Sequence, residues 1–472
     1  MPAPIRAYLP DLLVAGGAVH EGAALSVLGG EVVAVGEPAP GAERVRLAGK
    51  AILPGLVSAH GHSFQRAIRG RTQLRHPGRS DFWSWREAMY RAAARLEPDD
   101  VFAVARMAFH EAACAGITTV GEFHYLVGDP AGHPYDDPDR LAREVIRAAR
   151  EVGLRIVLLR AAYARGGAGV PPSPEQLRFV DGSAGEVVAS ALRLSRITAA
   201  DPAVTVGLAP HSVRACPAGW IEELAAEARH RRWPLHVHVA EQPAEVAHCR
   251  AEHGVTPVEL LARTGALGPG TTAVHAIHLE RSDVEALGRS RTTVCACPTT
   301  ERDLGDGVVP ADELLRAGAG LALGSDSMVQ VDLLEEARAL EGNLRLLRRE
   351  RGVLSPAGEA GTDALAARLL GFATQGGMAS LGLPGGALEV GDPADFASFD
   401  LADPSIAGAS AHDLRATVIF SAARTAVRRL GREASGRFRR PKSSRSVSRI
   451  SPSRNNPGNL PGASRMPPPN RP

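Results

Sequence analysis

Apolar and polar positions along the chain follow two rhythms. Residues 5 to about 54 alternate short apolar runs with glycine, as in LLVAGGAV and LSVLGGEVVAVG, which is typical of short antiparallel strands with tight turns. From about residue 55 to 385, strand-like runs are followed by helical patterns. These runs lie at 51–62, 116–123, 154–163, 204–212, 233–241, 271–279, 292–300 and 320–327.

Helical periodicity fills most of the intervals between these eight runs, for example at 100–115, 138–152, 217–231 and 257–265. Repeated strand–helix units predict a parallel sheet, and eight units predict an α/β fold closed into a (β/α)8 TIM-like barrel over residues 55–385. Short strands are predicted again within 388–400. We therefore expect a small composite β-sandwich domain built from residues 1–54 and 386–430.

The end of the chain differs in composition from the rest. Residues 431–472 are poor in apolar side chains and rich in Ser, Pro, Arg and Asn, which predicts a disordered basic tail. From Arg424 onward there are 13 Lys and Arg residues and one acidic residue, a charge of +12, so the net charge of +2 leaves −10 for the remainder. Such a tail attracts nucleic-acid phosphates. Phe438 is its only aromatic residue, however, and single-strand binders rely on aromatic stacking, so a nucleic-acid partner is disfavoured.

Composition indicates a cytoplasmic protein. The chain is 44% hydrophobic and 22% charged, and its five cysteines are scattered, which fits a reducing compartment rather than a disulfide framework. Pro10 and Asp11 interrupt the apolar core that a signal peptide requires. No apolar run approaches the ~20 residues of a membrane span, so we expect no membrane partner.

Histidines gather at the carboxyl ends of the predicted strands, where barrel enzymes carry their catalytic groups. Eight of the 16 histidines fall at five such ends, and acidic residues accompany them. Imidazole nitrogens and carboxylate oxygens suit a catalytic Zn²⁺ ion with one position left open for water. The predicted ligands are His60, His62, His238 and Asp326.

Each of these residues also has a purely structural interpretation. His236 or His238 could be a hydrogen-bonded histidine of the barrel core, and Asp326 could cap the following helix. Cys295 and Cys297, in the stretch CAC, are interpreted as buried strand packing rather than metal ligands, because no second cysteine pair accompanies them.

Several sequence blocks resemble one enzyme family. PGLVSAHGH, HVAE, VHAIH and GSDS are similar to the metal-dependent amidohydrolase superfamily, in its mononuclear deaminase branch. Within that branch HGHSFQRAIRGRT, DFWSWREAMYR, GITTVGEFHYL, APHSVRA, HVHVAEQ, CPTTERDLGDG and LGSDSMV resemble the formimidoylglutamate deiminases, over roughly residues 5–425. The resemblance implies one Zn²⁺ per subunit, a homodimer, and hydrolysis of N-formimidoyl-L-glutamate to N-formyl-L-glutamate and ammonia in L-histidine degradation.

The resemblance also implies roles for individual residues. Asp326 would accept the proton of the attacking water, His275 would orient and stabilise the new oxygen, and Glu241 would pass a proton to the departing nitrogen. Arg86 and Arg214 are the candidates for the two substrate carboxylates, since guanidinium pairs bidentately with carboxylate. The other predicted substrate-binding residues are Gln65, Tyr125 and His211.

Two alternatives stay open. Taken alone, Arg86 on a helix is typical of a solvated surface arginine. A deaminase of the same branch acting on a purine, pterin or other ring amidine is the alternative enzyme, although an aromatic content of 4% and two candidate carboxylate-binding arginines argue against a planar substrate.

The C-terminal segment departs from the family pattern. Relatives end with a strand pair after the segment that corresponds to ARTAVR, whereas VRRLGREASGRFRR shows no strand alternation. One hypothesis is that the reading frame shifted near residue 428. The small domain would then lack its last strands and expose a sheet edge.

Overall fold

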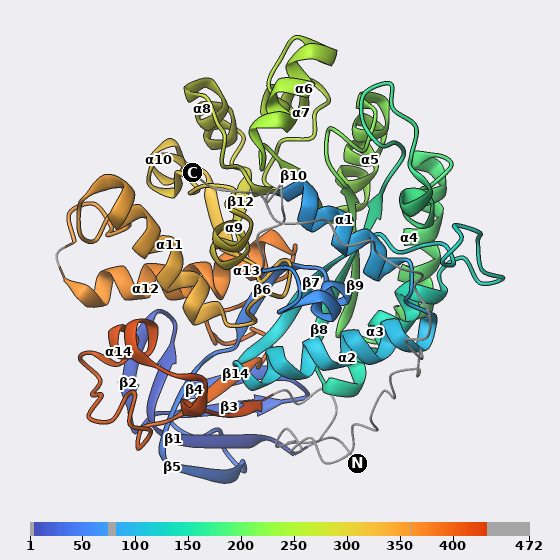
Figure 1. Ribbon diagram of the computed structural model, residues 1–472. Helices are drawn as coiled ribbons and strands as arrows, with labels where there is room; N and C mark the ends of the chain where they lie inside the picture. The colour runs from blue at the N-terminus through green and yellow to red at the C-terminus, as the bar shows by residue number, and fades with distance from the viewer. Residues whose placement is uncertain (1–3, 74–81, 360, 432–472) are drawn as a thin grey trace, which may run out of the picture. The chain divides into compact units, whose positions relative to one another are not determined.

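Eight parallel strands form the centre of the computed structural model, which describes residues 4–73, 82–359 and 361–431 (Figure 1). Each strand pairs with the next one in the chain, so strand order and sequence order coincide. The (β/α)8 barrel expected from the strand–helix rhythm is confirmed. The strands are β6 (Leu56–Gly61), β7 (Ile117–His124), β8 (Arg155–Ala162), β9 (Val204–Pro210), β10 (Leu235–Val239), β11 (Thr271–His275), β12 (Thr293–Ala296) and β13 (Gly320–Leu323).

The first and last strands meet at a short seam that closes the barrel. Gly61 and Asp326 form a parallel bridge. The Asp326 amide donates to the His60 carbonyl at 3.1 Å, and the His62 amide donates to the Asp326 carbonyl at 3.0 Å. Glycine is required at Gly324, because a Cβ there would lie 2.8 Å from the His60 carbonyl oxygen. Three of the predicted metal ligands are therefore part of the seam itself.

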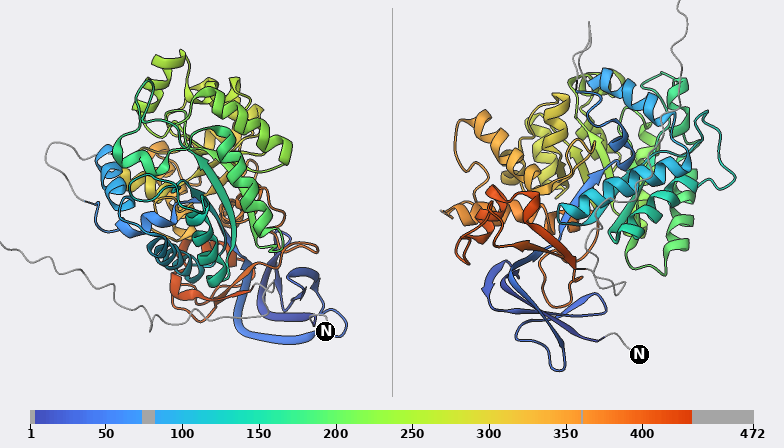
Figure 2. Two further views of the ribbon diagram at one scale, coloured as in Figure 1. Left: turned by 90° about the vertical axis from the view of Figure 1, so that its right-hand side faces the viewer. Right: turned by 60° about the horizontal axis from the view of Figure 1, so that its bottom comes forward.

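Helices follow the barrel strands and surround them in the views of Figure 2. Their ends carry ordinary capping signals. The Asp332 carboxylate accepts the amides of Leu334 and Glu335 at the start of α11, and Gly153 ends α3 with a φ of 93°. The helices are α1 (Phe82–Ala93), α2 (Pro98–Cys114), α3 (Arg140–Val152), α4 (Ala184–Thr198), α5 (Ala218–Arg231), α6 (Pro243–His253), α7 (Pro257–Arg263), α8 (Arg281–Arg289), α9 (Pro298–Leu304), α10 (Ala311–Ala317), α11 (Leu333–Arg348), α12 (Thr362–Phe372), α13 (Gln375–Ser380) and α14 (Leu414–Ser421), with 3-10 turns at η1 (Ser63–Ile68), η2 (Pro174–Phe179) and η3 (Arg424–Ala426).

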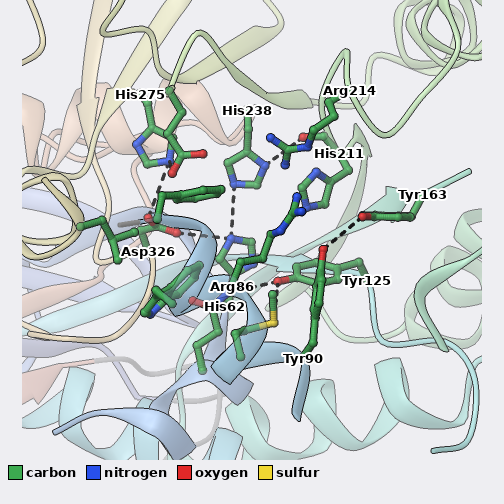
Figure 3. Close-up of a pocket in the computed structure, with 16 residues that line it drawn as sticks. His62, Arg86, Tyr90, Tyr125, Tyr163, His211, Arg214, His238, His275 and Asp326 are labelled. Carbon is green, nitrogen blue, oxygen red and sulfur yellow. Dashed lines mark hydrogen bonds and ion pairs between the residues drawn. The ribbon is translucent and has the colours of Figure 1, made fainter. Parts of the chain in front are cut away.

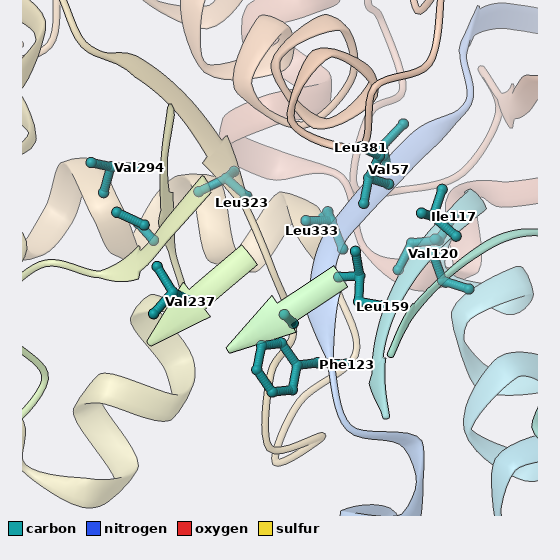
Figure 4. Close-up of a cluster of buried hydrophobic side chains, with 14 of the residues drawn as sticks. Val57, Ile117, Val120, Phe123, Leu159, Val237, Val294, Leu323, Leu333 and Leu381 are labelled. Carbon is teal, nitrogen blue, oxygen red and sulfur yellow. The ribbon is translucent and has the colours of Figure 1, made fainter. Parts of the chain in front are cut away.

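The main hydrophobic core runs between the barrel strands and their helices (Figure 4). Ile117 and Val120 of β7 and Leu159 of β8 are buried there, as is Leu333 at the start of α11. Because the strands are covered on both faces, they are apolar almost continuously, as parallel strands are expected to be. Among the described residues, no helix is long and apolar enough to cross a membrane.

A second, seven-stranded sheet uses both ends of the chain. Its strands are β1 (Arg6–Ala15), β2 (Ala18–Glu21), β3 (Ala24–Leu28), β4 (Glu31–Gly36), β5 (Glu43–Pro54), β14 (Phe396–Asp400) and β15 (Val427–Gly431). The order is β15-β14-β5-β1-β3-β4, with β2 on β1. The prediction of purely antiparallel strands in this region is wrong at its centre, because β1 and β5 pair in parallel.

Two further boundaries differ from the sequence expectations. The run 51–62 is divided: residues up to Pro54 end β5, and Leu56 begins β6, so Gly55 lies where the chain passes between the sheets. No strand pair was expected after the segment ARTAVR at 423–428, and the structure shows one strand there, since Val427–Gly431 pairs antiparallel with β14. Within 388–400 only Phe396–Asp400 forms a strand. The predicted tail lies outside the described residues from 432 onward.

Candidate active site

Four predicted metal ligands meet at the carboxyl ends of β6 and β10 and just after β13. His60, His62, His238 and Asp326 are all buried, and each offers a ligand atom within 4.8 Å of the others. The His238 Nε2 atom lies 3.1 Å from that of His60 and 3.3 Å from that of His62. The Asp326 Oδ1 atom lies 3.4 Å from His60 Nε2 and 3.3 Å from His62 Nε2.

These distances fit a bound divalent metal ion. Zinc bonds of about 2.0–2.2 Å give tetrahedral ligand–ligand edges of about 3.3–3.6 Å, close to the four distances above. Burial, together with the neighbouring His62 and His275, lowers the pKa of His60 to about 3, although Asp326 raises it. Burial, followed by the nearby histidines, holds the pKa of His238 well below its ordinary value. Neutral imidazoles are the form that coordinates a metal.

Backbone carbonyl groups orient two of the histidine rings, those of His62 and His238. His62 Nδ1 lies 2.9 Å from the Phe123 carbonyl, and His238 Nδ1 lies 2.9 Å from the His211 carbonyl. A proton on Nδ1 donated to each carbonyl leaves Nε2 as the free ligand atom, the usual arrangement of metal-binding histidines. Glu122 holds the segment after His62 in place. Its carboxyl accepts hydrogen bonds from the Ser63 amide at 2.9 Å and from the Ser63 hydroxyl at 2.6 Å.

The backbone is in left-handed conformations around the site. His275 has a φ of 70° and Asp326 a φ of 39°, and Ala240, Ala276 and Met328 are also positive. Residues other than glycine rarely adopt this region, and such positions concentrate at functional sites. Here the strained residues lie at or just after the carboxyl ends of β10, β11 and β13.

A chain of three ionisable groups borders the metal cluster. His275 Nε2 lies 3.5 Å from Glu241 Oε1 and 3.7 Å from Asp326 Oδ2, and its Nδ1 lies 3.3 Å from Glu301 Oε1. Burial lowers the pKa of His275, but the three carboxyl groups outweigh it and hold that pKa well above its usual value. Burial raises the pKa of Glu241 to about 7, although His275 opposes the shift. Glu241 can therefore hold or release a proton near neutral pH.

The predicted residues surround one cavity (Figure 3). All of them line it except His60, which is fully buried. Gln65 Nε2 donates to the Tyr125 hydroxyl at 3.1 Å on one wall. His236, the alternative core histidine, lies away from the cavity with Nε2 2.9 Å from the Ser380 carbonyl.

Arg86 and Arg214 line the cavity and come from two different parts of the chain. Arg86 comes from α1 and Arg214 from the segment after β9, and their guanidinium carbons lie 4.4 and 5.6 Å from the centre of the Trp83 ring. Arg86 is half-buried, so the surface interpretation does not hold. Arg86 Nη1 and Arg214 Nε and Nη1 are buried without a hydrogen-bond partner among the described residues. Unpaired buried donors are costly, so the two cations form a ready site for anionic groups.

Sequence reasoning missed part of the cavity wall. Tyr90 and Tyr163 line it, and Gln176 Nε2 donates to both hydroxyls, at 3.1 and 2.6 Å. Glu301 was not assigned a role either, although it lies just beyond the end of β12, where the rule for strand ends could have found it. The other lining residues that were not predicted are Phe82, Trp85, Met89 and Leu304.

Comparisons with known proteins agree with this geometry. The chain is 37% identical over 384 residues to a formimidoylglutamate deiminase of Pseudomonas aeruginosa, covering 81% of this chain and 83% of that protein. It is 31% identical to a 5-methylthioadenosine/S-adenosylhomocysteine deaminase of Halobacterium salinarum, covering 80% and 79%. A crystal structure of an amidohydrolase from Brucella melitensis superposes with a TM-score of 0.82 at 30% identity, covering 90% and 93%.

The family model describes most of the chain. The model of the amidohydrolase family matches residues 51–430, which include the whole barrel and every residue of the site. The hydrolase relatives and the buried cluster of histidines and aspartate agree on the chemistry, a metal-dependent hydrolysis of a C–N bond. The chain belongs to the amidohydrolase family.

Proposed function

We propose that this enzyme hydrolyses N-formimidoyl-L-glutamate to N-formyl-L-glutamate and ammonia. The observation that carries the proposal is the pair of guanidinium groups, Arg86 and Arg214, in the same cavity as the metal cluster. The two guanidinium groups match the two carboxylates of a dicarboxylic substrate in number and charge, and each has at least one buried N–H group without a partner among the described residues. The 37% identical relative bearing the name of this activity supports the same substrate.

We infer one zinc ion per subunit, held by His60, His62, His238 and Asp326. Three imidazoles and a carboxylate are donors that zinc accepts in catalytic sites. The bound ion would supply a water molecule activated for attack at neutral pH.

The remaining chemistry belongs to side chains of the protein. The formimidoyl group is an amidine that is protonated at neutral pH, and the Glu241 carboxylate complements its charge. Glu241 takes up a proton released as water attacks the carbon, and it delivers that proton to the terminal nitrogen when the C–N bond breaks, so the nitrogen leaves as ammonia. The cationic His275 donates a hydrogen bond toward the oxygen newly bonded to carbon, where negative charge develops.

The rest of the substrate lies toward Arg86 and Arg214. Gln65, Tyr125 and His211 line the same cavity as the two arginines and the metal cluster, and we assign them to orienting the glutamate backbone. Burial, reinforced by Arg214, holds the pKa of His211 well below its ordinary value, so it stays neutral and adds no third positive charge. We also infer a role in L-histidine degradation. The cytoplasmic location and the homodimer stay predictions from sequence.

Ring deamination is the alternative, because another relative is named as a 5-methylthioadenosine/S-adenosylhomocysteine deaminase. 5-Methylthioadenosine offers no carboxylate to the two arginines and S-adenosylhomocysteine offers one, so at least one guanidinium group would remain without a carboxylate in either complex. That mismatch favours the dicarboxylic amidine.

The test is ammonia release by the purified protein from N-formimidoyl-L-glutamate, with 5-methylthioadenosine and guanine measured in parallel. We expect release from the first substrate only, its loss after chelation, and its return with one equivalent of Zn²⁺. Folded, zinc-loaded protein that acts on a purine and leaves N-formimidoyl-L-glutamate intact would establish the alternative instead.

A further inference from the structure

A cysteine lies beside the proposed catalytic centre without a part in the reaction. Cys297 directly follows β12, and its sulfur lies within 4.8 Å of a ligand atom of His275 and of Asp326. All three side chains are buried. They come from the carboxyl ends of β11, β12 and β13, which are consecutive neighbours in the barrel. The interpretation of Cys297 as strand packing is therefore incomplete, although it does pack with Cys295 in a small buried cluster.

The Asp326 carboxylate faces two ways. Its Oδ1 atom points to the Nε2 atoms of His60 and His62, at 3.4 and 3.3 Å. Its Oδ2 atom is directed to the other side, 3.7 Å from His275 Nε2. A carboxylate with one oxygen on each side can bridge two metal ions, which lie about 3.5–4 Å apart in two-metal sites.

The hydrogen bonding of His275 is like that of a metal-binding histidine. Its Nδ1 atom is engaged by the Glu301 carboxyl at 3.3 Å, which leaves Nε2 directed toward Asp326 and Glu241. A carboxylate behind the ring is the common outer partner of a metal-ligating histidine. Glu241 Oε1, 3.5 Å from Nε2, adds negative charge next to the same point.

We propose that His275 Nε2, Cys297 Sγ and Asp326 Oδ2 form a second, inhibitory site for a thiophilic divalent cation such as Zn²⁺ or Cd²⁺. Sulfur, imidazole and carboxylate together are a donor set that zinc accepts, and thiolate favours soft cations over Mg²⁺ or Ca²⁺. The second ion binds more weakly than the first, because it has three protein ligands and is repelled by the neighbouring cation.

Occupation of this second site stops turnover. His275 Nε2 and Asp326 Oδ2 are bound to the second ion, so neither atom is free for the roles assigned above. The inhibition therefore rests on the proposed function, whereas the existence of the site does not. Both His275 and Asp326 line the cavity, so a cation can reach them by the route that substrate takes.

The experiment compares the parent enzyme with Cys297→Ser and with the matched control Cys295→Ser. Cys295 is equally buried, lies two residues earlier and packs in the same cluster. Protein loaded with one equivalent of Zn²⁺ is titrated with further Zn²⁺ or Cd²⁺, and bound metal is counted after equilibrium dialysis. In parallel, metal-free protein is titrated with Co²⁺ and its absorption is recorded for a thiolate-to-cobalt charge-transfer band.

For the parent and Cys295→Ser we expect two bound equivalents, a thiolate band that appears with the second equivalent, and loss of activity as the second site fills. For Cys297→Ser we expect one equivalent, no band, and at least a tenfold higher Zn²⁺ concentration for half-inhibition. First-site stoichiometry and the thermal melt verify that each variant folds.

Three results would overturn the second site: one equivalent and no thiolate band in the parent, a band that persists in Cys297→Ser, or a band that disappears in Cys295→Ser. The first of these results is measured on the parent protein alone, so the proposal can be refuted even if Cys297→Ser does not fold. Metal counts and spectra require no substrate. A protein with the second site that does not act on N-formimidoyl-L-glutamate would refute the proposed substrate and leave the second site standing.

Discussion

Replacing Arg214 with glutamine tests whether the paired guanidiniums recognise the substrate. Arg214 carries two buried N–H groups without a partner among the described residues, so a carboxylate can accept two charge-assisted hydrogen bonds there. Hydrogen bonds to charged groups contribute about 1.5–3 kcal/mol each. Glutamine retains one weaker donor, and we expect a net loss of about 3 kcal/mol, which corresponds to a roughly hundredfold lower kcat/KM.

The assay is ammonia release with three substrates. Besides N-formimidoyl-L-glutamate, these are N-formimidoyl-L-norvaline, which lacks the side-chain carboxylate, and 4-(formimidoylamino)butyrate, which lacks the α-carboxylate. If Arg214 binds one particular carboxylate, the variant loses activity on the two substrates that carry it and is unchanged on the third. Arg86→Gln should give the complementary pattern.

Arg91→Gln is the matched control, because Arg91 is exposed on the same helix as Arg86. It should change none of the three rates. Equal losses on all three substrates in both cavity variants would refute carboxylate recognition and indicate a structural role for the two arginines.

Three further predictions concern carboxyl groups around the site. Glu241→Gln should lower kcat by about 10²–10⁴-fold with metal content unchanged, because it removes the proton carrier; loss of the bound metal instead would contradict that role. Glu301→Ala should lower kcat about 10–100-fold with little change in KM, since it releases the His275 ring, and Glu301→Asp should restore part of the rate; a change confined to KM would count against positioning. Burial raises the folded-state pKa of Glu122 from its ordinary 4.5 to about 8, although its hydrogen bonds to Ser63 oppose the shift. The stability from this group is complete below pH 4.5 and is lost as pH rises to 8, at up to about 1.4 kcal/mol per pH unit. The unfolding free energy, measured in urea from pH 4.5 to 8, should fall less for Glu122→Gln than for the parent protein. Parallel plots of unfolding free energy against pH for the two proteins would show instead that Glu122 is ionised throughout this range.

The sequence was sufficient for the barrel because parallel strands buried on both faces leave long apolar runs separated by helical periodicity. The strand-end rule then brought residues as distant as His60 and Asp326 together. The direction of strand pairing could not be predicted from the sequence. β1 and β5 pair in parallel although β2, β3 and β4 lie between them in the chain, and alternation within a strand does not indicate which strand it pairs with. The strand Val427–Gly431 was missed because arginines dominate it, while β14 supplies its pairing.

Within the site, residue types could be predicted and orientation could not. Glu301 directly follows the predicted strand at 292–300, but only the fold directs its carboxyl to His275 Nδ1. Asp326 has a positive φ, which no local sequence pattern at an aspartate indicates. By sequence, Arg86 is an ordinary helix arginine, and only the structure shows that its side chain lines the cavity.

The seam between β6 and β13 has a consequence for biosynthesis. His60 and His62 are translated early and Asp326 late, so most of the barrel is synthesised before the carboxylate partner of these two histidines exists. A chain that ends before Asp326 lacks both the backbone bridge to Gly61 and the fourth proposed ligand. If the proposed ligands hold the ion, tight metal binding requires the completed barrel, and a truncated product should bind the ion weakly.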